Sequence, residues 1–351
     1  MTDLRSGFTT GTCAAAAAKA ATMLLCGQPA QETIEVALPD GERVRLPILL
    51  ARRTEDGAEA TVRKDAGDDP DVTDGATVVA SVRWSDNGDV TFAAGEGVGT
   101  VTKPGLSIPP GEPAINPVPR NMIRSAVREV TDRGVKVTIS IPDGRELAEK
   151  TFNPRLGVEG GLSILGTTGR VRPFSCPALR EALRCALDVA VACGIRSPVL
   201  VPGHIGERAA RRRFLLVPEQ VIEVSNEWGF ILDQIAGRSL DRLLVLGHPG
   251  KLAKLSVGQW DTHSSRSESA TPVVAELAGE VLGRSLPESK TTEGLFADLP
   301  PGNQRQVADA LSEKVRRAVA GRLGNRLDVS VVLVNMKGDL LGSSGDLAPW
   351  Q

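Results

Sequence analysis

The sequence predicts two domains, an α+β domain over residues 1–194 and an α/β domain over residues 195–351. Extended segments separated by turn signals dominate up to residue 194, which indicates a mixed sheet. Beyond it, short apolar runs alternate with helical stretches, which is typical of a doubly wound domain with a four-stranded parallel sheet. A chain of 351 residues is long enough for two cores, and we expect a ligand cleft between them.

Composition narrows the possible partners. A formal net charge of −2 disfavours a nucleic-acid partner, which would need a basic surface. The five cysteines form no CxxC pair, which favours reduced thiols and a cytoplasmic location. Lys19 interrupts the first apolar run, so we expect neither a signal peptide nor a membrane span. A small-molecule ligand fits this composition. The sequence does not decide whether the protein forms a homo-oligomer.

The stretch SGFTTGTCAAAAAKAA (6–21) leads into a helix expected over about residues 12–26. A threonine at its start would cap the helix, where free N–H groups and the helix dipole favour an anion. The substrate-binding candidates here are Thr9, Thr10 and Thr12. Alternatively, the alanine run makes a thin helix that packs tightly against a sheet, and physical reasoning leaves both interpretations open.

The next segments read as strands. Residues 32–38 and 42–50 flank a Pro-Asp-Gly turn and predict a hairpin, and further strands are expected at 59–65, 76–84, 89–94 and 135–141. A GxGxG motif follows at Gly95-Glu96-Gly97-Val98-Gly99. A Rossmann-type cofactor loop requires a helix directly after it, but a proline-rich run follows instead. We therefore interpret these glycines as a loop or bulge.

The proline-rich run over residues 101–123 predicts a stiff, extended ribbon that ends in a helix at about 117–132. Lys103, Asn116 and Arg120 project from it at fixed positions and are candidates for holding a large ligand. A structural crossover that covers a sheet is the alternative. We favour a ligand role because a basic residue, Arg120, stands in the first helical turn, where an acidic one is more usual.

A second loop rich in glycine and hydroxyl groups occurs at Gly166-Thr167-Thr168-Gly169, followed by Arg170 and Arg172. Its main-chain N–H groups and hydroxyls make it a cofactor-binding candidate. A helix is expected over about 177–193.

In the second domain, parallel strands are expected at 197–202, 220–225, 242–247 and 328–335. Helices are expected at about 205–214, 227–237, 250–256, 269–284 and 303–323. Ligands of such sheets bind beyond the carboxyl ends of the strands, where two GHxG turns occur. The cofactor-binding candidates there are Gly203, His204, Gly206, Gly247, Gly250 and Lys251. A P-loop is excluded, because Val245 and Leu252 stand where its glycine and hydroxyl residue belong.

The three histidines, His204, His248 and His263, lack the spacing of a zinc site, so we expect no protein-bound metal. His263 and His248 are the catalytic candidates, as general bases. Cys13 stands at a helix start, where a thiol can be activated, but we favour a packing role.

Four stretches resemble the CbiD family, the cobalt-precorrin-5B C1-methyltransferases of anaerobic cobalamin biosynthesis. They are FTTGTCAAAAAKAA (8–21), VTKPGLSIPPGEPAINPVPRNMI (101–123), GGLSILGTTG (160–169) and NEWGF…GHPGKLAKL…THS (226–264). The last is looser, with Pro249 where the family usually has isoleucine, and Arg170 replaces an apolar residue.

The resemblance implies methyl transfer from S-adenosyl-L-methionine to C1 of a cobalt-bearing tetrapyrrole, in a non-Rossmann architecture. It also implies a first domain like a rearranged ribosomal-protein-S5 domain. The cobalt arrives in the substrate, whose carboxylates suit arginine and lysine. The basic candidates are Lys103, Arg120, Arg172, Lys251 and Lys254. Two alternatives remain: another step on the same ring, such as lactone opening or deacylation in ring contraction, and a non-catalytic tetrapyrrole carrier.

Overall fold

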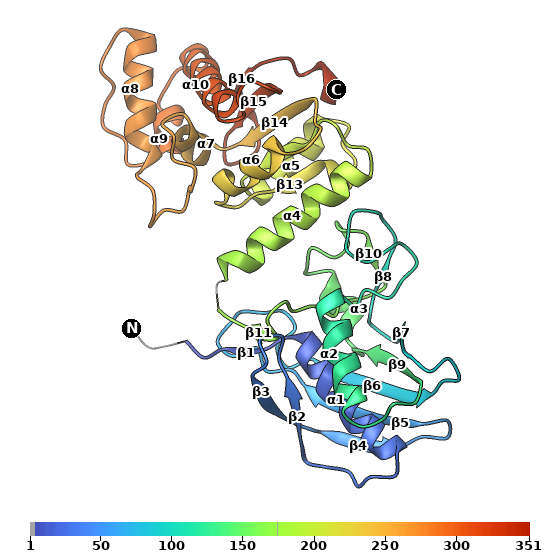
Figure 1. Ribbon diagram of the computed structural model, residues 1–351. Coiled ribbons are helices and arrows are strands. Elements are labelled where there is room, and N and C mark those ends of the chain that lie inside the picture. Colours follow the sequence, from blue (N-terminus) through green and yellow to red (C-terminus); the bar gives the residue numbers. More distant parts are fainter. Residues whose placement is uncertain (1–3, 174) are drawn as a thin grey trace. The chain divides into compact units, whose positions relative to one another are not determined.

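A computed structural model describes residues 4–173 and 175–351, and the chain divides into two compact units, Met1–Cys176 and Pro177–Gln351 (Figure 1). The sequence-based boundary at residue 194 differs from this division. Helix α4 (Cys176–Ala192), expected to end the first domain, contributes Leu183 and Leu187 to the core of the second unit instead. The difference arises because a helix sequence specifies an apolar face but not which sheet that face will cover.

The first unit contains a mixed sheet in the order β4-β5-β6-β9-β7. Its strands are β4 (Leu50–Arg53), β5 (Ala58–Arg63), β6 (Thr77–Trp84), β7 (Val90–Ala94) and β9 (Val135–Ser140). All neighbours are antiparallel except β7 and β9, which run parallel. The expected strands from residue 59 to 141 are confirmed, and the likeness to a ribosomal-protein-S5 domain stays a prediction.

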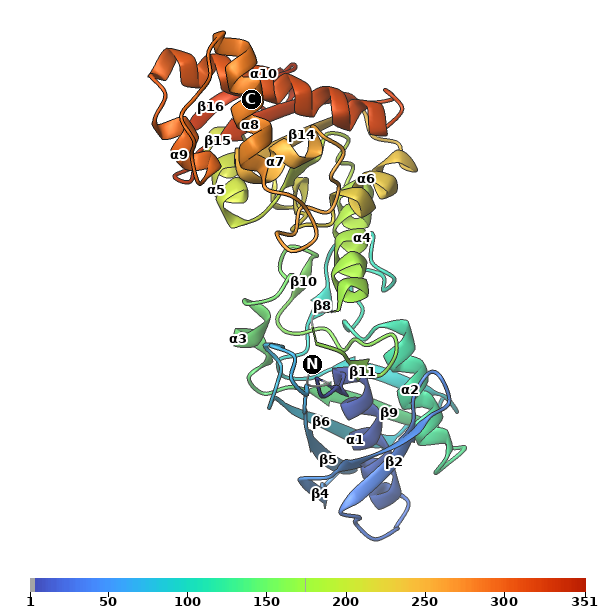
Figure 2. The ribbon, with the colours of Figure 1, turned by 90° about the vertical axis from the view of Figure 1, so that its left-hand side faces the viewer.

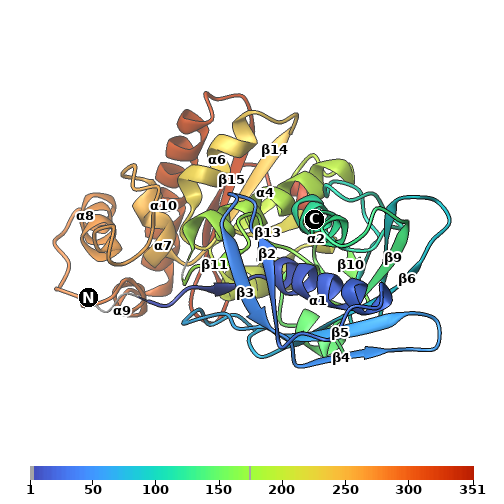
Figure 3. The same ribbon diagram turned by 60° about the horizontal axis from the view of Figure 1, so that its bottom comes forward.

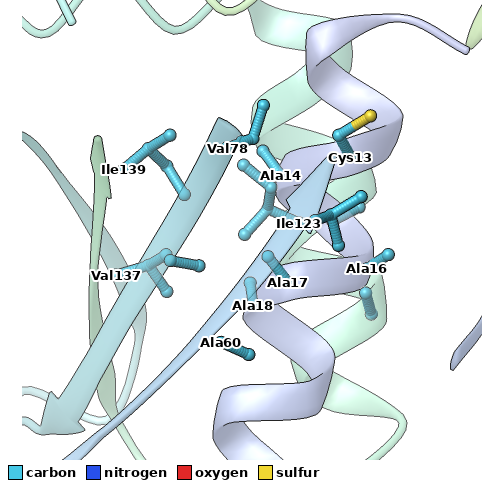
Figure 4. Packing of buried hydrophobic residues seen from close by; sticks show 14 of the residues in the cluster. Cys13, Ala14, Ala16, Ala17, Ala18, Ala60, Val78, Ile123, Val137 and Ile139 are labelled. Carbon is cyan, nitrogen blue, oxygen red and sulfur yellow. The ribbon is translucent and has the colours of Figure 1, made fainter. Parts of the chain in front are cut away.

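Helix α1 (Thr10–Leu25) lies between this sheet and helix α2 (Pro117–Arg128). Figure 4 shows Ala14, Ala17 and Ala18 on the side of α1 that faces the strands carrying Val78 and Val137. The alanines from 14 to 18 are fully buried. A helix covered on two sides needs apolar residues all round, and alanine lets both neighbours approach its axis closely. The tight-packing interpretation of this stretch is therefore confirmed.

Short paired strands complete the first unit. The predicted hairpin forms from β2 (Thr33–Ala37) and β3 (Arg43–Pro47), and it runs beside α1 (Figure 3). Lys19 on α1 donates to the carbonyl oxygen of Glu35 at 2.7 Å and so joins the two. Two further antiparallel pairs link distant segments: β1 (Gly7–Phe8) with β11 (Arg170–Val171), and β8 (Thr100–Val101) with β10 (Val158–Glu159). Helix α3 (Gly144–Ala148) follows β9.

The GxGxG segment forms a loop rather than a cofactor cradle. Gly97 has a φ of +69°, and a Cβ there would lie 1.8 Å from the carbonyl oxygen of Ile141. The glycines thus allow two backbone segments to touch, which is a structural role.

The second unit contains a sheet in the order β13-β12-β14-β15-β16. The strands β12 (Val199–Val201), β13 (Val221–Glu223), β14 (Arg242–Gly247) and β15 (Asp328–Val334) run parallel, as expected. Strand β16 (Leu340–Ser344) adds an antiparallel edge that the sequence analysis missed. Its short, glycine-containing sequence LLGSS carries little strand signal.

Helices cover both faces of this sheet (Figure 2). Helix α5 (His204–Arg213) packs on one face, while α4, α6 (Trp228–Ala236), α7 (Pro249–Leu255) and α10 (Pro301–Arg322) pack on the other. Helix α8 (Ala270–Leu282) packs against α7 and α10. The short helix α9 (Thr292–Ala297) was not expected from the sequence. Two 3₁₀ turns, Pro218–Gln220 and Ala348–Trp350, complete the elements.

The close packing around α1 implies that a larger side chain there should destabilise the first unit. Ala17→Leu should lower the free energy of unfolding of the first unit by about 1–3 kcal/mol, because a larger side chain must displace the sheet or α2. The control Met23→Leu, at a half-buried position of the same helix, should change it by less than about 1.5 kcal/mol. Urea denaturation measures both, and equal losses would contradict close packing at Ala17.

Candidate functional site

The sheet of the second unit has a switch point between β12 and β14. Helix α5 follows β12 on one face, and α7 follows β14 on the other, so the chain leaves two neighbouring strands in opposite directions. Open α/β sheets bind ligands in the crevice at such a point. The turns Gly203-His204 and Gly247-His248 stand at these strand ends. The topology therefore brings the two GHxG turns together.

The glycines of these turns have different roles. A Cβ on Gly247 would lie 2.6 Å from the Cδ of Pro202, and one on Gly206 would lie 3.0 Å from the carbonyl oxygen of Leu246. Both positions need glycine because the turns touch each other. Gly203 has extended backbone, and the nearest atom to its added Cβ is the Oε1 of Glu223, at 3.6 Å. Of these three glycines, Gly203 is the least crowded, since its added Cβ would make an ordinary van der Waals contact.

His248 joins three segments at this edge. Its Nδ1 accepts from the backbone N–H of Gly250 at 3.0 Å, which places the ring proton on Nε2. Nε2 then donates to the Oε2 of Glu293 at 2.9 Å. The other carboxylate oxygen of Glu293 accepts from the backbone N–H of Met336, 3.3 Å away, just after β15. Both ring nitrogens are engaged, so His248 is a helix cap and a link rather than a free base.

Sequence reasoning missed Glu293. The polar run Thr291-Thr292-Glu293 before Leu295 is a helix-start signal, and Thr291 does accept from the backbone N–H of Gly294. Nothing in the sequence connects this helix start with His248, which lies 45 residues earlier.

The other two histidines have separate surroundings. His204 begins α5 with a side chain that is 78% exposed, and its Nδ1 lies 4.0 Å from the Oε2 of Glu207. His263 lies in the loop before α8, where its Nδ1 is 2.8 Å from the hydroxyl of Ser265. In the part of the chain that the structure describes, no hydrogen bond joins His263 and His248. The two catalytic candidates therefore do not act as a hydrogen-bonded pair in this structure.

Lys251 reaches from α7 to the loop after β13, where it donates to the Oδ1 of Asn226. Burial lowers the pKa of Lys251, and the positive charge of Lys254 lowers it further. Lys254 is almost completely buried. These two cations and Asn226 extend the polar groups at the carboxyl edge, and Asn226 was not singled out from the sequence.

In the first unit, the three threonines are held by main-chain groups. Thr10 Oγ1 donates to the carbonyl oxygen of Leu165 at 3.2 Å and accepts from its N–H at 3.0 Å. Thr12 Oγ1 donates to the carbonyl oxygen of Gly169 at 2.6 Å. Thr9 caps α1 by accepting from the N–H of Thr12 at 3.3 Å. All three are buried, and the hydroxyls of Thr10 and Thr12 position the 165–169 loop, while Thr9 reaches it through its backbone N–H, which donates to the carbonyl oxygen of Gly169 at 3.1 Å.

The same loop depends on two glycines with positive φ. A Cβ on Gly166 would lie 2.3 Å from the Oγ1 of Thr9, and one on Gly169 would lie 2.7 Å from the Cδ2 of Leu38. These glycines allow close packing on α1. Thr167 and Thr168 face outward and are exposed. The cofactor candidates thus fall in two units, residues 166–169 in the first and the GHxG turns in the second.

Arg120 holds the proline-rich ribbon in place. Its Nε donates to the carbonyl oxygen of Ile115 at 2.8 Å, and its terminal nitrogen donates to that of Pro113 at 3.1 Å and lies 3.2 Å from Glu112. Arg170 likewise pairs with Glu42, at 2.5 Å. The sequence could not indicate these partners, because a basic residue that binds main-chain oxygens has the same signature as one that binds a ligand.

The remaining basic and amide candidates differ in their exposure. Arg172 is exposed and forms no hydrogen bond or ion pair with the described residues. Asn116 precedes α2 without capping it through its side chain. The stem of Lys103 lies against Gly157, whose added Cβ would be 2.5 Å from the Cγ of Lys103. Arg172 and Asn116 are therefore the side chains best placed to take a new partner.

Cys13 is fully buried, and burial raises the pKa of its thiol to about 12. A thiol with this pKa stays protonated near neutral pH. The packing role favoured from the sequence agrees with this environment.

Metal-ligand clusters and membrane-spanning helices are both absent from the described residues. No group of three or more His, Cys, Asp or Glu side chains among them is arranged to hold a metal ion. No helix among them is long and apolar enough to cross a membrane.

Comparison with known proteins identifies the family. Residues 1–173 match the CbiD family, and residues 261–345 match the CbiD C-terminal domain. A relative from Syntrophotalea carbinolica, named cobalt-precorrin-5B C(1)-methyltransferase, is 60% identical over all of both chains. One of the same name from Desulfitobacterium hafniense is 42% identical over 96% of this chain and 89% of its own.

A crystal structure of the cobalamin biosynthesis protein CbiD from Archaeoglobus fulgidus is 31% identical, covering 75% of this chain and 83% of that one, with a TM-score of 0.41. The fold defines a protein of two units, one α+β and one α/β, whose second sheet has a switch point between β12 and β14. By the extent of its sequence similarity, the chain belongs to the CbiD family.

Replacing glycine by alanine should affect stability differently in the two turns. Gly247→Ala should destabilise the second unit by about 1–3 kcal/mol, because the new methyl group meets the Pro202 ring at 2.6 Å. Gly203→Ala should change stability by less than about 0.5 kcal/mol, since its backbone is extended and the new methyl group would make only an ordinary contact, 3.6 Å from the Oε1 of Glu223. Thermal unfolding distinguishes them, and equal effects would show that the turns do not touch as described.

Proposed function

We propose that this chain transfers a methyl group from S-adenosyl-L-methionine to C1 of cobalt-precorrin-5B and so forms cobalt-precorrin-6A. The observation that supports this most strongly is the 60% identity, over the whole of both chains, to a relative named for that activity. The cobalt ion of this reaction is part of the substrate, so the protein needs no metal ligand of its own.

The methyl donor is assigned to the crevice at the carboxyl ends of β12 and β14. When bound, S-adenosyl-L-methionine supplies an electrophilic methyl group together with a carboxylate, an ammonium group and ribose hydroxyls. The groups at these strand ends suit it: Glu293 is an acceptor, Lys251 is a cationic donor, and the backbone at Gly203 carries no side chain that would block a ligand. Glu293 keeps exposed surface while it holds His248, so it remains accessible to a ligand donor.

Alignment is the main task of the protein in this reaction. Holding two reactants in the right geometry is worth up to roughly 7–11 kcal/mol of the barrier. The hydrogen bonds of His248 and Glu293 keep the ends of β14 and β15 in fixed positions, which serves alignment. Neither His248 nitrogen is available as a general base in this arrangement, so we assign His248 a positioning role.

The macrocycle is assigned to the first unit. Arg172 and Asn116 have unengaged polar groups, and the exposed Thr167 and Thr168 stand on the loop held by Thr9, Thr10 and Thr12. An arginine can hold a carboxylate through two parallel hydrogen bonds, which suits a substrate with acetate and propionate groups. The buried threonines act through the loop rather than by direct contact.

Label transfer tests the activity. The protein, incubated with methyl-labelled S-adenosyl-L-methionine and cobalt-precorrin-5B, should yield a macrocycle heavier by one methyl group in mass spectrometry. Loss of a fragment would indicate ring-contraction chemistry, and an unchanged mass with intact substrate and folded protein would indicate a carrier. Either result would overturn the proposal.

The arginines provide a matched pair. Arg172→Lys should raise the substrate KM roughly tenfold with stability unchanged, because the charge stays but the two-bond contact is lost. Arg120→Lys should instead lower the free energy of unfolding by about 1–2 kcal/mol, because carbonyl oxygens of the ribbon lose their donors. Steady-state kinetics and urea denaturation measure the two. A raised KM for Arg120→Lys at unchanged stability would instead indicate that Arg120 contacts the substrate.

A further inference from the structure

Two lysines of α7, Lys251 and Lys254, lie one turn apart and have only neutral hydrogen-bond partners within the described residues. Lys251 Nζ donates to the Oδ1 of Asn226, and Lys254 Nζ donates to the hydroxyl of Ser267 at 2.8 Å and the carbonyl oxygen of Thr262 at 3.4 Å. Neither ammonium group forms an ion pair with a carboxylate in that part of the chain.

Burial makes this arrangement unfavourable without a counter-charge. Lys254 is 7% exposed, and a buried ammonium group costs several kcal/mol unless an anion is paired with it. Burial and the charge of Lys254 both lower the pKa of Lys251, while Asp261 acts in the opposite direction. The positive charge of the pair is therefore incompletely neutralised by the protein.

Two carboxylates of the adjoining loops are engaged by arginines. Asp261 pairs with Arg266 at 3.0 Å, and Glu227 pairs with Arg180 at 2.7 Å. The backbones of Glu227 and Asp261 also form a bridge, which holds the two loops together. Each arginine neutralises one carboxylate, so the positive charges of Lys251 and Lys254 are left without a counter-charge from these two acids.

The lysines lie beside the switch point. Asn226 follows β13, and α7 follows β14, with β12 between these strands. The contact of Lys251 with Asn226 consequently spans the carboxyl end of β12, on the face covered by α6 and α7. Ser225, before Asn226, has a φ of +57°, which is rare for a residue other than glycine.

Asn226 has donors to spare. Its Oδ1 accepts from Lys251 and also from the hydroxyl of Thr262 at 3.3 Å. With the oxygen engaged in this way, the two N–H bonds of the amide remain available as donors. The side chains here are thus two ammonium groups and an amide nitrogen, all of them donors.

We propose that Lys251, Lys254 and Asn226 form a subsite for a carboxylate group of a bound ligand. Such a group would supply the missing counter-charge and accept hydrogen bonds from ammonium and amide nitrogens. This proposal rests on the proposed function for the source of the carboxylate. Both the amino-acid end of S-adenosyl-L-methionine and the side chains of the tetrapyrrole carry one.

The test uses Lys251→Gln and Lys254→Met in the full chain, with Lys290→Gln as a control at an exposed lysine. Isothermal calorimetry measures the affinity for S-adenosylhomocysteine and for 5′-methylthioadenosine, which lacks the amino-acid end. Kinetics measures the KM for cobalt-precorrin-5B. Lys254→Met preserves volume, and thermal unfolding checks that each variant folds.

If the cofactor supplies the carboxylate, both variants should bind S-adenosylhomocysteine roughly tenfold or more weakly, with 5′-methylthioadenosine unaffected. If the macrocycle supplies it, its KM should rise by a similar factor while S-adenosylhomocysteine affinity stays unchanged. Variants that fold and match the control in all three measurements would overturn the subsite. Label transfer by the unaltered protein is measured alongside, so failure of the subsite is distinguishable from failure of the proposed function.

Discussion

The close approach of a sheet and a second helix to the alanine-rich helix α1 determines much of the first unit. Small side chains from Ala14 to Ala18 let α1 be buried on both sides, and this fixes where its amino end lies. At that end, Thr10 and Thr12 bind the main chain of the 165–169 loop. Strand β1 continues the same connection by pairing with β11, which ends one residue before Arg172. The candidate binding side chains of this unit are thus held by helix packing.

Periodicity in the sequence predicted most of this fold, because strands and helices with apolar faces carry local signals. It placed the parallel strands of the second unit and the helix at Thr10–Leu25 within a few residues. It failed where the outcome depends on distant partners. Helix α4 joined the other core, β16 has the glycine- and serine-containing sequence LLGSS, and α9 spans only six residues.

The candidate site shows the same limit. The turns with Gly203 and Gly247 were predictable, because glycine and strand ends are visible in the sequence. Glu293 was not, since its role depends on a contact with His248, 45 positions earlier. The position of Asn226 after a strand was visible, but its contact with Lys251, 25 positions later, was not. Arg120 and the three threonines were identified as polar groups at suggestive positions, but the structure engages them with main-chain oxygens and nitrogens. Sequence alone cannot separate a polar group that holds a loop from one that holds a ligand.

The central claim is that the methyl donor binds at the switch point of the second unit. A crystal structure of the protein with S-adenosylhomocysteine tests it directly. We expect the ligand to lie against the carboxyl ends of β12 and β14, in contact with Glu293 and the turn at Gly203. A ligand bound instead against the glycine loop at residues 95–99, with the β12–β14 crevice empty, would contradict it.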